Sequence, residues 1–228
     1  MEPENSIDSA KALILAAALP HAAFDGWSET TLVAALADSG VAPALGRALY
    51  PRGGIDLAVA YHRSGDAAMK TALAATDLAA LRYRDRVALA IRLRLQTADK
   101  ELVRRGSALF SLPQHAPEGA KLIWATADAI WTSLGDSSQD LNWYSKRATL
   151  SAVYSATVLF WLGDHSEDNG DTWAFLDRRI ENVMQFEKTK AALQANPLAK
   201  ALLAGPLKIL DRIRAPHRNT DLPGHSEP

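Results

Sequence analysis

The segment LNWYSKRATLSAVYSATVLFWL, residues 141–162, decides the fold of this chain. Its apolar side chains recur at the three- and four-residue spacing of a helix rather than the alternation of a strand. One inward-facing stripe is therefore expected to contain Leu150, Val153, Tyr154, Thr157 and Trp161. Polar loops at 136–140 and 165–170 bound the segment. It predicts one long core helix.

Gly, Pro and short polar stretches separate further helical segments on both sides of this one. No run of alternating β-branched residues is long enough to predict a strand, so we expect an all-α protein. Ser6, Ser28 and Asp171 are the expected N-caps of three of the helices. The expected helices cover residues 9–23, 29–38, 43–49, 55–65, 66–80, 83–97 (or 66–97 as one helix), 99–110, 118–134, 141–162, 171–194 and a last amphipathic segment 196–214.

The composition is that of a globular protein, with 48% hydrophobic residues and a formal net charge of −1. The near-zero charge gives no strong field for nucleic acid, and the absence of Cys excludes disulfides and thiolate metal sites. The acidic start of the chain resembles neither a signal peptide nor a mitochondrial transit peptide. Residues 148–162, the longest apolar stretch, are too few and too polar to predict a membrane-spanning helix.

The sequence predicts no catalytic residue, no metal site and no cofactor. The six His are scattered, and none follows a Glu by three residues, as the di-iron bundles require. There is no His-Glu-x-x-His, no Gly-x-Ser-x-Gly and no Gly-rich phosphate loop. His165-Ser166-Glu167-Asp168 has metal-ligand residue types, but we expect a solvated turn there.

The first 63 residues resemble the helix-turn-helix part of TetR-type repressors. DNA binding depends mainly on Lys and Arg side chains that neutralise phosphates. Residues 1–63 contain four basic and seven acidic residues, a net charge of −3, and the segment 43–49 offers only Arg47 as a long polar side chain. We therefore expect a degenerate helix-turn-helix that binds no nucleic acid. A TetR-type transcriptional regulator with a small-molecule pocket is the alternative.

Three further segments suggest surfaces. Residues 82–105 are locally basic, which fits a solvated helix face or a surface for anionic lipid headgroups. Trp143 and Tyr144 are adjacent and so point about 100° apart on a helix. Either one of them is exposed for a partner, or both pack where the helix begins. The pattern alone does not decide between these two alternatives.

The last segment, 196–214, predicts an interfacial helix that contacts a membrane. On a helical wheel one side of the segment is apolar, and the other is polar and mainly basic, with Lys200, Lys208, Asp211 and Arg212. A core helix that closes the domain is the alternative. Residues 215–228, rich in Pro, Gly, Ser and charge, are expected to be disordered. The apolar side of the segment consists of Leu198, Leu202, Leu203, Ile209, Leu210 and Ile213.

The stretch from Asp136 to Tyr154, centred on DLNWYSKRA at 140–148, resembles the ninth coenzyme Q biosynthesis protein family. DTWAFL at 171–176, the loop LPQHAP at 112–117 and Gly26-Trp27 continue the likeness. It runs over most of residues 10–195 and is most specific at 128–180. The C-terminal segment is similar in character rather than in sequence.

The resemblance implies a TetR-like, dimeric, non-enzymatic protein that binds an isoprenoid lipid, such as a ubiquinone precursor, or a phospholipid. It implies delivery of that lipid to the di-iron demethoxyubiquinone hydroxylase, with an amphipathic C-terminal helix at the membrane surface. The family's hydroxylase-facing patch corresponds to Ile130, Asp140, Trp143, Tyr144 and Arg147. Ala129 and Ser133 depart from the family's pattern of an acidic and an aromatic residue, which bears on partner affinity.

The resemblance and the punctuation together divide the chain into four parts. Residues 1–63 are the TetR-like N-terminal helices, 64–195 the lipid-binding domain, 196–214 the membrane-facing helix and 215–228 the tail. Without a transit peptide, we expect a bacterial form that lies in the cytoplasm, peripheral to the inner membrane.

Overall fold

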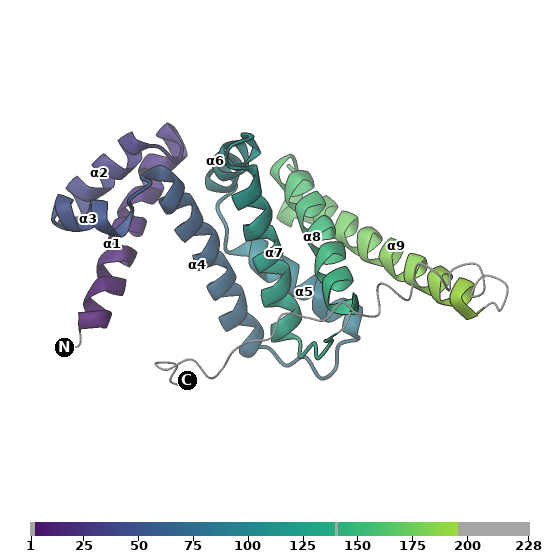
Figure 1. Ribbon diagram of the computed structural model, residues 1–228. Helices are drawn as coiled ribbons and strands as arrows, with labels where there is room; N and C mark the ends of the chain where they lie inside the picture. Colours follow the sequence, from purple (N-terminus) through teal and green to yellow (C-terminus); the bar gives the residue numbers. More distant parts are fainter. Residues whose placement is uncertain (1–2, 140, 196–228) are drawn as a thin grey trace.

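The computed structural model describes residues 3–139 and 141–195. Their regular structure is entirely helical, which confirms the all-α prediction (Figure 1). The helices are α1 (Pro3–Asp25), α2 (Glu29–Ser39), α3 (Pro43–Leu49), α4 (Gly54–Ala74), α5 (Tyr83–Gln96), α6 (Lys100–Ser111), α7 (Ala116–Ser133), α8 (Leu141–Leu162), the 3-10 turn η1 (Glu167–Asn169) and α9 (Gly170–Ala195).

The N-terminal helices α1–α3 lie on one side of α4, and α5–α9 lie on the other (Figure 1). Ser28 caps α2 as expected, because its Oγ accepts a hydrogen bond from the Thr31 amide at 3.2 Å. Gly40 ends α2 with a φ of 67°, a conformation that suits glycine. The prediction of Ser6 as a cap is wrong, since α1 begins at Pro3 and Ser6 lies inside it.

Helix α4 continues through Gly65, where we expected one helix to end and the next to begin. The glycine is needed for packing rather than for a turn. A Cβ at Gly65 would collide with the guanidinium of Arg94, which crosses beneath α4. The expected helices 55–65 and 66–80 are therefore one helix, which ends at Ala74.

The inward stripe of α8 is confirmed, because all five of its residues are at most 8% exposed. Helix α9 begins at Gly170, and Asp171 lies in its first turn. Asp164 takes the capping role expected of Asp171. Its carboxylate accepts hydrogen bonds from the amide and hydroxyl of Thr172 and from Ser166. These bonds hold the pKa of Asp164 well below its usual range.

Two hydrophobic clusters form the core, and α4 contributes to both. The first joins α1–α4 and α6, with Ile14, Leu32 and Leu57 among its fully buried members. The second joins α4, α5, α7, α8 and α9, with Met69 and Ile91. We call the boundary between these two clusters the seam, and the candidate site lies at this boundary.

Residues 6–25 of α1 are long and apolar enough to cross a membrane by length and composition alone. Core helices of folded proteins pass the same test. Ile14, Ala18 and Ala22 of this segment are fully buried in the first cluster, although only 17% of the segment's apolar window is buried in all. The expected membrane-facing helix 196–214 and tail 215–228 lie outside the described residues.

Candidate functional site

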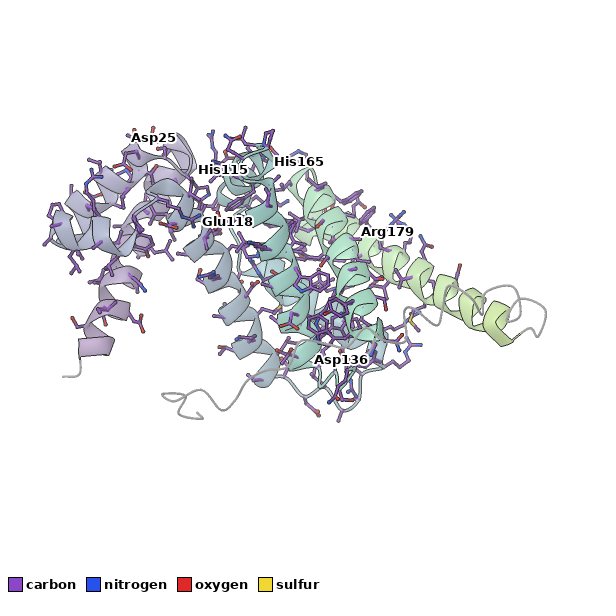
Figure 2. The ribbon with its side chains drawn as sticks, in the orientation of Figure 1. Asp25, His115, Glu118, Asp136, His165 and Arg179 are labelled. Carbon is purple, nitrogen blue, oxygen red and sulfur yellow. The ribbon has the colours of Figure 1, made fainter. Side chains whose placement is uncertain are left out.

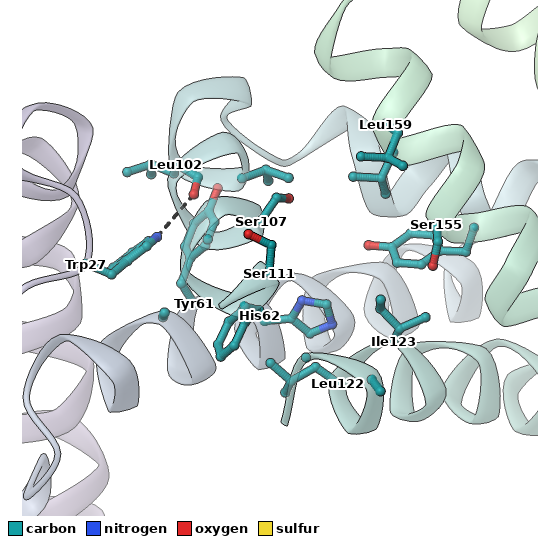
Figure 3. Close-up of a pocket in the computed structure, with 18 of the residues that line it drawn as sticks. Trp27, Tyr61, His62, Leu102, Ser107, Ser111, Leu122, Ile123, Ser155 and Leu159 are labelled. Carbon is teal, nitrogen blue, oxygen red and sulfur yellow. Dashed lines mark hydrogen bonds between the residues drawn. The ribbon is translucent and has the colours of Figure 1, made fainter. Parts of the chain in front are cut away.

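A cavity of about 380 Å³ lies between α4, α6, α7 and α8, with Trp27 on the side of the N-terminal helices (Figure 3). Its wall is mostly apolar, and its inner part includes the buried Leu102 and Leu122. Exposed residues, among them Ala116, Ala120 and Leu159, border its mouth. The volume lies at the lower end of the roughly 300–1,000 Å³ typical of small-molecule pockets.

Trp27 and Tyr61 build the wall of the cavity at the seam. The Trp27 indole donates a hydrogen bond to the Leu102 carbonyl at 3.1 Å, and its ring centroid lies 5.3 Å from that of Tyr61. The Tyr61 hydroxyl accepts a hydrogen bond from the Asp99 amide at 3.0 Å. These contacts fix the N-terminal helices against α4 and the start of α6.

Four polar residues from the three helices α4, α5 and α7 meet beneath the apolar wall: His62, Asp66, Arg94 and Thr126. Arg94 Nε donates to Asp66 Oδ1 at 2.7 Å, and its Nη2 donates to the His62 carbonyl at 2.9 Å. The Thr126 hydroxyl donates to the same carboxylate at 2.9 Å. Asp66 and Arg94 are at most 9% exposed, so their opposite charges compensate each other inside the protein.

The hydrogen bonds of Thr126 assign the tautomer of His62. Because the Thr126 hydroxyl gives its one proton to Asp66, it accepts a proton from His62 Nε2, 2.8 Å away. Burial lowers the pKa of His62 to about 4, so the ring is neutral near pH 7. The ring also has a hydrogen bond with the backbone of Leu122, which offsets part of this lowering of the pKa.

The basic stretch 82–105 is largely neutralised by acidic residues of this chain. Arg94 is buried on Asp66, whereas Arg84 lies 2.6 Å from Glu181 and Arg92 lies 3.1 Å from Asp177. The stretch therefore ties α5 to α4 and α9. The described contacts fit neither prediction for this stretch completely. Its arginines form neither a fully solvated face nor a row of unpaired cations open to lipid headgroups.

Trp124, Trp143 and Tyr144 form an aromatic cluster on α7 and the first turn of α8. The ring centroids of Trp143 and Tyr144 are 4.8 Å apart, and Trp124 lies 6.0 Å from Trp143 and 6.4 Å from Tyr144. All three side chains are partly exposed. Both sequence readings hold in part, since the two adjacent aromatics pack together and still present part of their surface.

Arg147 supports the aromatic cluster from below. Its guanidinium carbon lies 4.0 Å from the Trp143 ring centroid, and it is bonded to Asp128 at 2.6 Å and to Asp136 at 3.1 Å. Burial alone would raise the pKa of Asp136, but hydrogen bonds from Lys146, Ser138 and Arg147 hold it at about 2. Asp136 lies at the end of the helical bundle opposite to His165 (Figure 2).

The structure separates the residues assigned to the partner patch. Trp143 and Tyr144 are partly exposed, whereas Ile130 is fully buried and Arg147 is 2% exposed. Ile130 and Arg147 therefore lie behind the surface that Trp143 and Tyr144 present. Asp140 lies outside the described residues. So do all six membrane-facing residues, Leu198, Leu202, Leu203, Ile209, Leu210 and Ile213.

His165, Glu167 and Asp168 are exposed, as expected for a solvated turn. Within the described residues, no three His, Asp or Glu side chains gather as they would around a metal ion. Sequence reasoning missed the polar group of His62, Asp66, Arg94 and Thr126. The one local signal was the spacing of His62 and Asp66, four residues apart on an otherwise apolar helix face.

Comparisons with known proteins place the likeness on the same helices. The COQ9 family model matches residues 116–187, which run from α7 into α9. The chain is 38% identical over 120 residues to the Ubiquinone biosynthesis protein COQ9, mitochondrial, of Rattus norvegicus, and 36% identical over 120 residues to that of Homo sapiens. Each alignment covers 53% of this chain.

A longer alignment reaches the N-terminal helices. The chain is 29% identical over 187 residues, 79% of its length, to the protein of the same name from Drosophila melanogaster. The chain covers 38%, 37% and 57% of the rat, human and fly proteins, respectively. The matched region includes the aromatic cluster and the α7 and α8 walls of the cavity.

Proposed function

Because the COQ9 family model matches residues 116–187 of this chain, we propose that the protein serves ubiquinone biosynthesis as a non-enzymatic carrier of an apolar lipid. The observation that supports this most is the cavity of about 380 Å³ with its mostly apolar wall. The lipid would be an isoprenoid ubiquinone precursor or a phospholipid. A carrier lifts such a molecule from the bilayer, where a water-soluble enzyme reaches its headgroup with difficulty.

The titratable groups at the cavity fit a carrier better than a catalyst. Asp66 is bonded to Arg94 and Thr126, and His62 is neutral with its proton shared with Thr126. A general base needs a proton-accepting group with a pKa near the working pH. The pKa of His62, at about 4, lies well below that range, and the carboxylate of Asp66 is engaged by the guanidinium of Arg94. We therefore propose no catalytic residue and no cofactor.

The aromatic cluster of Trp124, Trp143 and Tyr144 is the proposed docking surface for the di-iron hydroxylase. Trp, Tyr and Arg contribute most to the affinity of protein interfaces. The rings are held in place by each other and by Arg147, so little side-chain freedom is lost on binding. This proposal assigns contact to Trp143 and Tyr144, and support to Ile130 and Arg147.

The remaining partners are proposals of the same kind. A homodimer is supported by apolar surface on α8 and α9, where Phe160 stacks on Phe175 at 4.5 Å and Leu159 is 68% exposed. Light scattering of the full chain tests it, and a monomer at every concentration would contradict it. Membrane contact through residues 196–214 and a bacterial cytoplasmic location both stay predictions. The relatives above carry "mitochondrial" in their names.

DNA binding finds no support in the N-terminal helices. Arg47, the long polar side chain of α3, is bonded to Glu29 of α2 at 2.7 Å. Arg52, at the following turn, is bonded to Asp56 and Glu118. A cation that already has an acidic partner gains less from a phosphate. Gel shifts at low salt test the regulator alternative, which requires retention of duplex DNA.

Mass spectrometry of organic extracts from the purified full-length protein tests the carrier proposal. We expect a co-purified isoprenoid or phospholipid. Ala120→Trp should place a large ring at the cavity mouth and lower the lipid content several-fold, whereas Ala125→Trp, exposed on the same helix but away from the cavity, should not. Protein that never contains either lipid, in any preparation, would reject the proposal.

A further inference from the structure

Helix α1 has an apolar outer face that no other segment of the described part of the chain covers. Residues 12–24 contain no Lys, Arg, Asp or Glu, and their one titratable side chain, His21, is bonded to Asp38 of α2 at 2.7 Å. Only 17% of the apolar window within residues 6–25 is buried. A helix that is apolar on all sides is normally buried on all sides, so we expect a further partner for this face.

The exposed residues of this face form one stripe along the helix. Leu13 and Phe24, at its two ends, are 55% and 82% exposed. The spacing of three and four residues along the stripe is that of the seam between two packed helices. Small side chains at its centre leave room for bulky side chains of a partner helix. We call these residues the α1 stripe: Leu13, Ala16, Pro20 and Phe24.

The charge around the α1 stripe selects among possible partners. Residues 1–39, which include α1 and α2, contain one basic and six acidic residues, a net charge of −5. A second α1 would bring the same acidic excess, and an anionic membrane surface would also be repelled. Residues 196–214 contain four basic residues and one acidic residue, a net charge of +3. Their predicted apolar side consists of Leu and Ile, which are the bulky side chains that the stripe can accept.

The arrangement of the helices indicates which chain supplies this segment. Residue 196 directly follows the end of α9, and that end lies at the opposite side of the molecule from α1 (Figure 1). Helices α4, α7 and α8 lie between the two (Figure 1). A helix that begins at residue 196 therefore starts far from the α1 stripe of its own chain, and a second copy of the chain is the better donor.

From this charge complementarity we propose that, away from a membrane, residues 196–214 of one chain pack their apolar side on the α1 stripe of a second chain. On a helical wheel Arg212 and Arg214 flank the apolar side, where they can meet the acidic residues around the stripe. A bilayer competes for the same apolar side, so membrane binding releases α1. This inference goes beyond the carrier proposal, because it does not depend on what the cavity holds.

Disulfide trapping in the full-length protein tests the contact, since the chain has no cysteine of its own. One preparation carries Ala16→Cys in the α1 stripe, and another, with a size tag, carries Ala199→Cys on the apolar side of the segment. After mixing and mild oxidation, the disulfide between the two chains should form at least about fivefold faster than with Ala125→Cys in place of Ala16→Cys, because docking raises the effective concentration of the thiols. Ala125 is exposed on α7 and is the matched control.

Two perturbations should weaken the trapping. Liposomes of phosphatidylcholine and phosphatidylglycerol should slow it several-fold, because they compete for the segment. Phe24→Glu, added to the Ala16→Cys preparation, should slow it without liposomes and leave the melting temperature unchanged, since Phe24 is 82% exposed. Leu45→Glu, at an exposed leucine of α3, is the control and should change neither the trapping nor the melting temperature.

Each other outcome rejects part of the inference. Equal trapping rates for Ala16→Cys and Ala125→Cys would overturn the docking. A predominant disulfide between two chains that both carry Ala16→Cys would mean that α1 packs on a second α1 instead. A double variant, Ala16→Cys with Ala199→Cys, that forms its disulfide within one chain would reject the second copy as donor. Trapping that liposomes do not slow, although they bind the protein, would reject the competition. The carrier proposal is decided separately, by the lipid content of the organic extracts.

Discussion

Arg147 shows how a single buried cation can govern a surface. Its guanidinium is packed against the Trp143 ring on one side and bonded to Asp128 and Asp136 on the other. Removing one partner of a buried ion pair typically costs about 3–5 kcal/mol. A substitution at Arg147 would therefore disturb the fold and the docking surface together, so its effect on docking cannot be separated from its effect on stability. A substitution at Trp143, which lies at the surface, can separate these two effects.

At the residue scale, Trp143→Ala should weaken association with the proposed hydroxylase at least about tenfold, as loss of a central interface aromatic does. Thermal stability should fall by only about 1–2 kcal/mol, since the ring is partly exposed and loses contacts with Arg147, Tyr144 and Trp124 that are each worth about 1 kcal/mol or less. Biolayer interferometry and thermal melts measure the two effects.

Trp173→Ala is the matched control for this substitution. Trp173 is also partly exposed and lies 5.5 Å from an arginine, Arg92, but on α9, away from the aromatic cluster. It should lower stability to a similar extent and leave association unchanged. A large loss of stability in Trp143→Ala alone would show that Trp143 is a core residue instead.

His62 predicts how stability depends on pH. Its pKa is about 4 when folded and 6.5 ordinarily, so between these values the unfolded chain binds a proton that the folded chain does not. The contribution is complete above pH 6.5 and is lost as the pH falls toward 4. It amounts to about 3 kcal/mol in full. Urea midpoints measured from pH 7 to 4.5 should fall in the wild type and fall less in His62→Gln. Parallel slopes would contradict this.

The residues of the site differ in how far the sequence could predict them. Trp143 and Tyr144 stand out because two adjacent aromatics on a helix cannot share one face. The partnership of His62, Asp66, Arg94 and Thr126 could not be predicted. These residues lie on the three helices α4, α5 and α7, up to 64 positions apart, and nothing in the local pattern of α5 distinguishes the buried Arg94 from its paired surface neighbours.

At the element scale, we expect Gly65→Ala to lower the free energy of unfolding, the opposite of the usual effect of this substitution within a helix. In an exposed helix interior, Gly→Ala usually stabilises by roughly 0.5–1 kcal/mol. In Gly65→Ala, the new Cβ would displace the Arg94 guanidinium from Asp66 and the His62 carbonyl. Bonds to charged groups are worth about 1.5–3 kcal/mol, so we expect a net loss of about 1–2 kcal/mol.

Gly106→Ala is the control for this element. Gly106 is also a helix-interior glycine, on α6, but its Cβ would lie at an ordinary distance of 3.6 Å from Trp27 Nε1. It should gain stability where Gly65→Ala loses it, as measured by urea unfolding. If both variants change the free energy of unfolding in the same direction, the lack of a side chain at Gly65 is not what makes room for Arg94.

The boundaries of the helices show the same limit of sequence reading. The ends marked by local chemistry, such as Ser28 before α2 and the polar loops around α8, were predicted within a residue or two. The break at Gly65 was not a break, because its cause lies on another helix. Glycine as a helix terminator and glycine as a passage for a neighbouring side chain have the same sequence signature.

At the scale of the whole molecule, the membrane proposal depends on residues outside the described part of the chain. Deleting residues 196–228 should abolish flotation with anionic liposomes, because it removes the proposed apolar and basic faces. Circular dichroism should still show a helical, cooperatively melting domain, since both hydrophobic clusters lie within residues 1–195. Unchanged flotation would reject residues 196–214 as the membrane element.

Hydrophobic periodicity was sufficient to predict the all-α class. It was not sufficient to predict that the core divides into two hydrophobic clusters. Periodicity states which face of each helix is buried, but not which helices share a core. Trp27 belongs to the first cluster and Tyr154 to the second, yet both border one cavity. That adjacency depends on α4 running between the two clusters, which no single segment encodes.

The cavity at the seam also bears on how the protein unfolds. A cavity between two hydrophobic clusters reduces the packing contacts that join them, and such contacts make two clusters unfold as one unit. A lipid in the cavity would restore such contacts, because Trp27 of the first cluster and Tyr154 of the second both border the cavity. A bound lipid would thus hold the two clusters together. The protein with lipid would unfold in a single step, whereas unfolding of the protein without lipid would begin at α1–α3. Amide hydrogen exchange in those helices would then report whether a molecule is loaded.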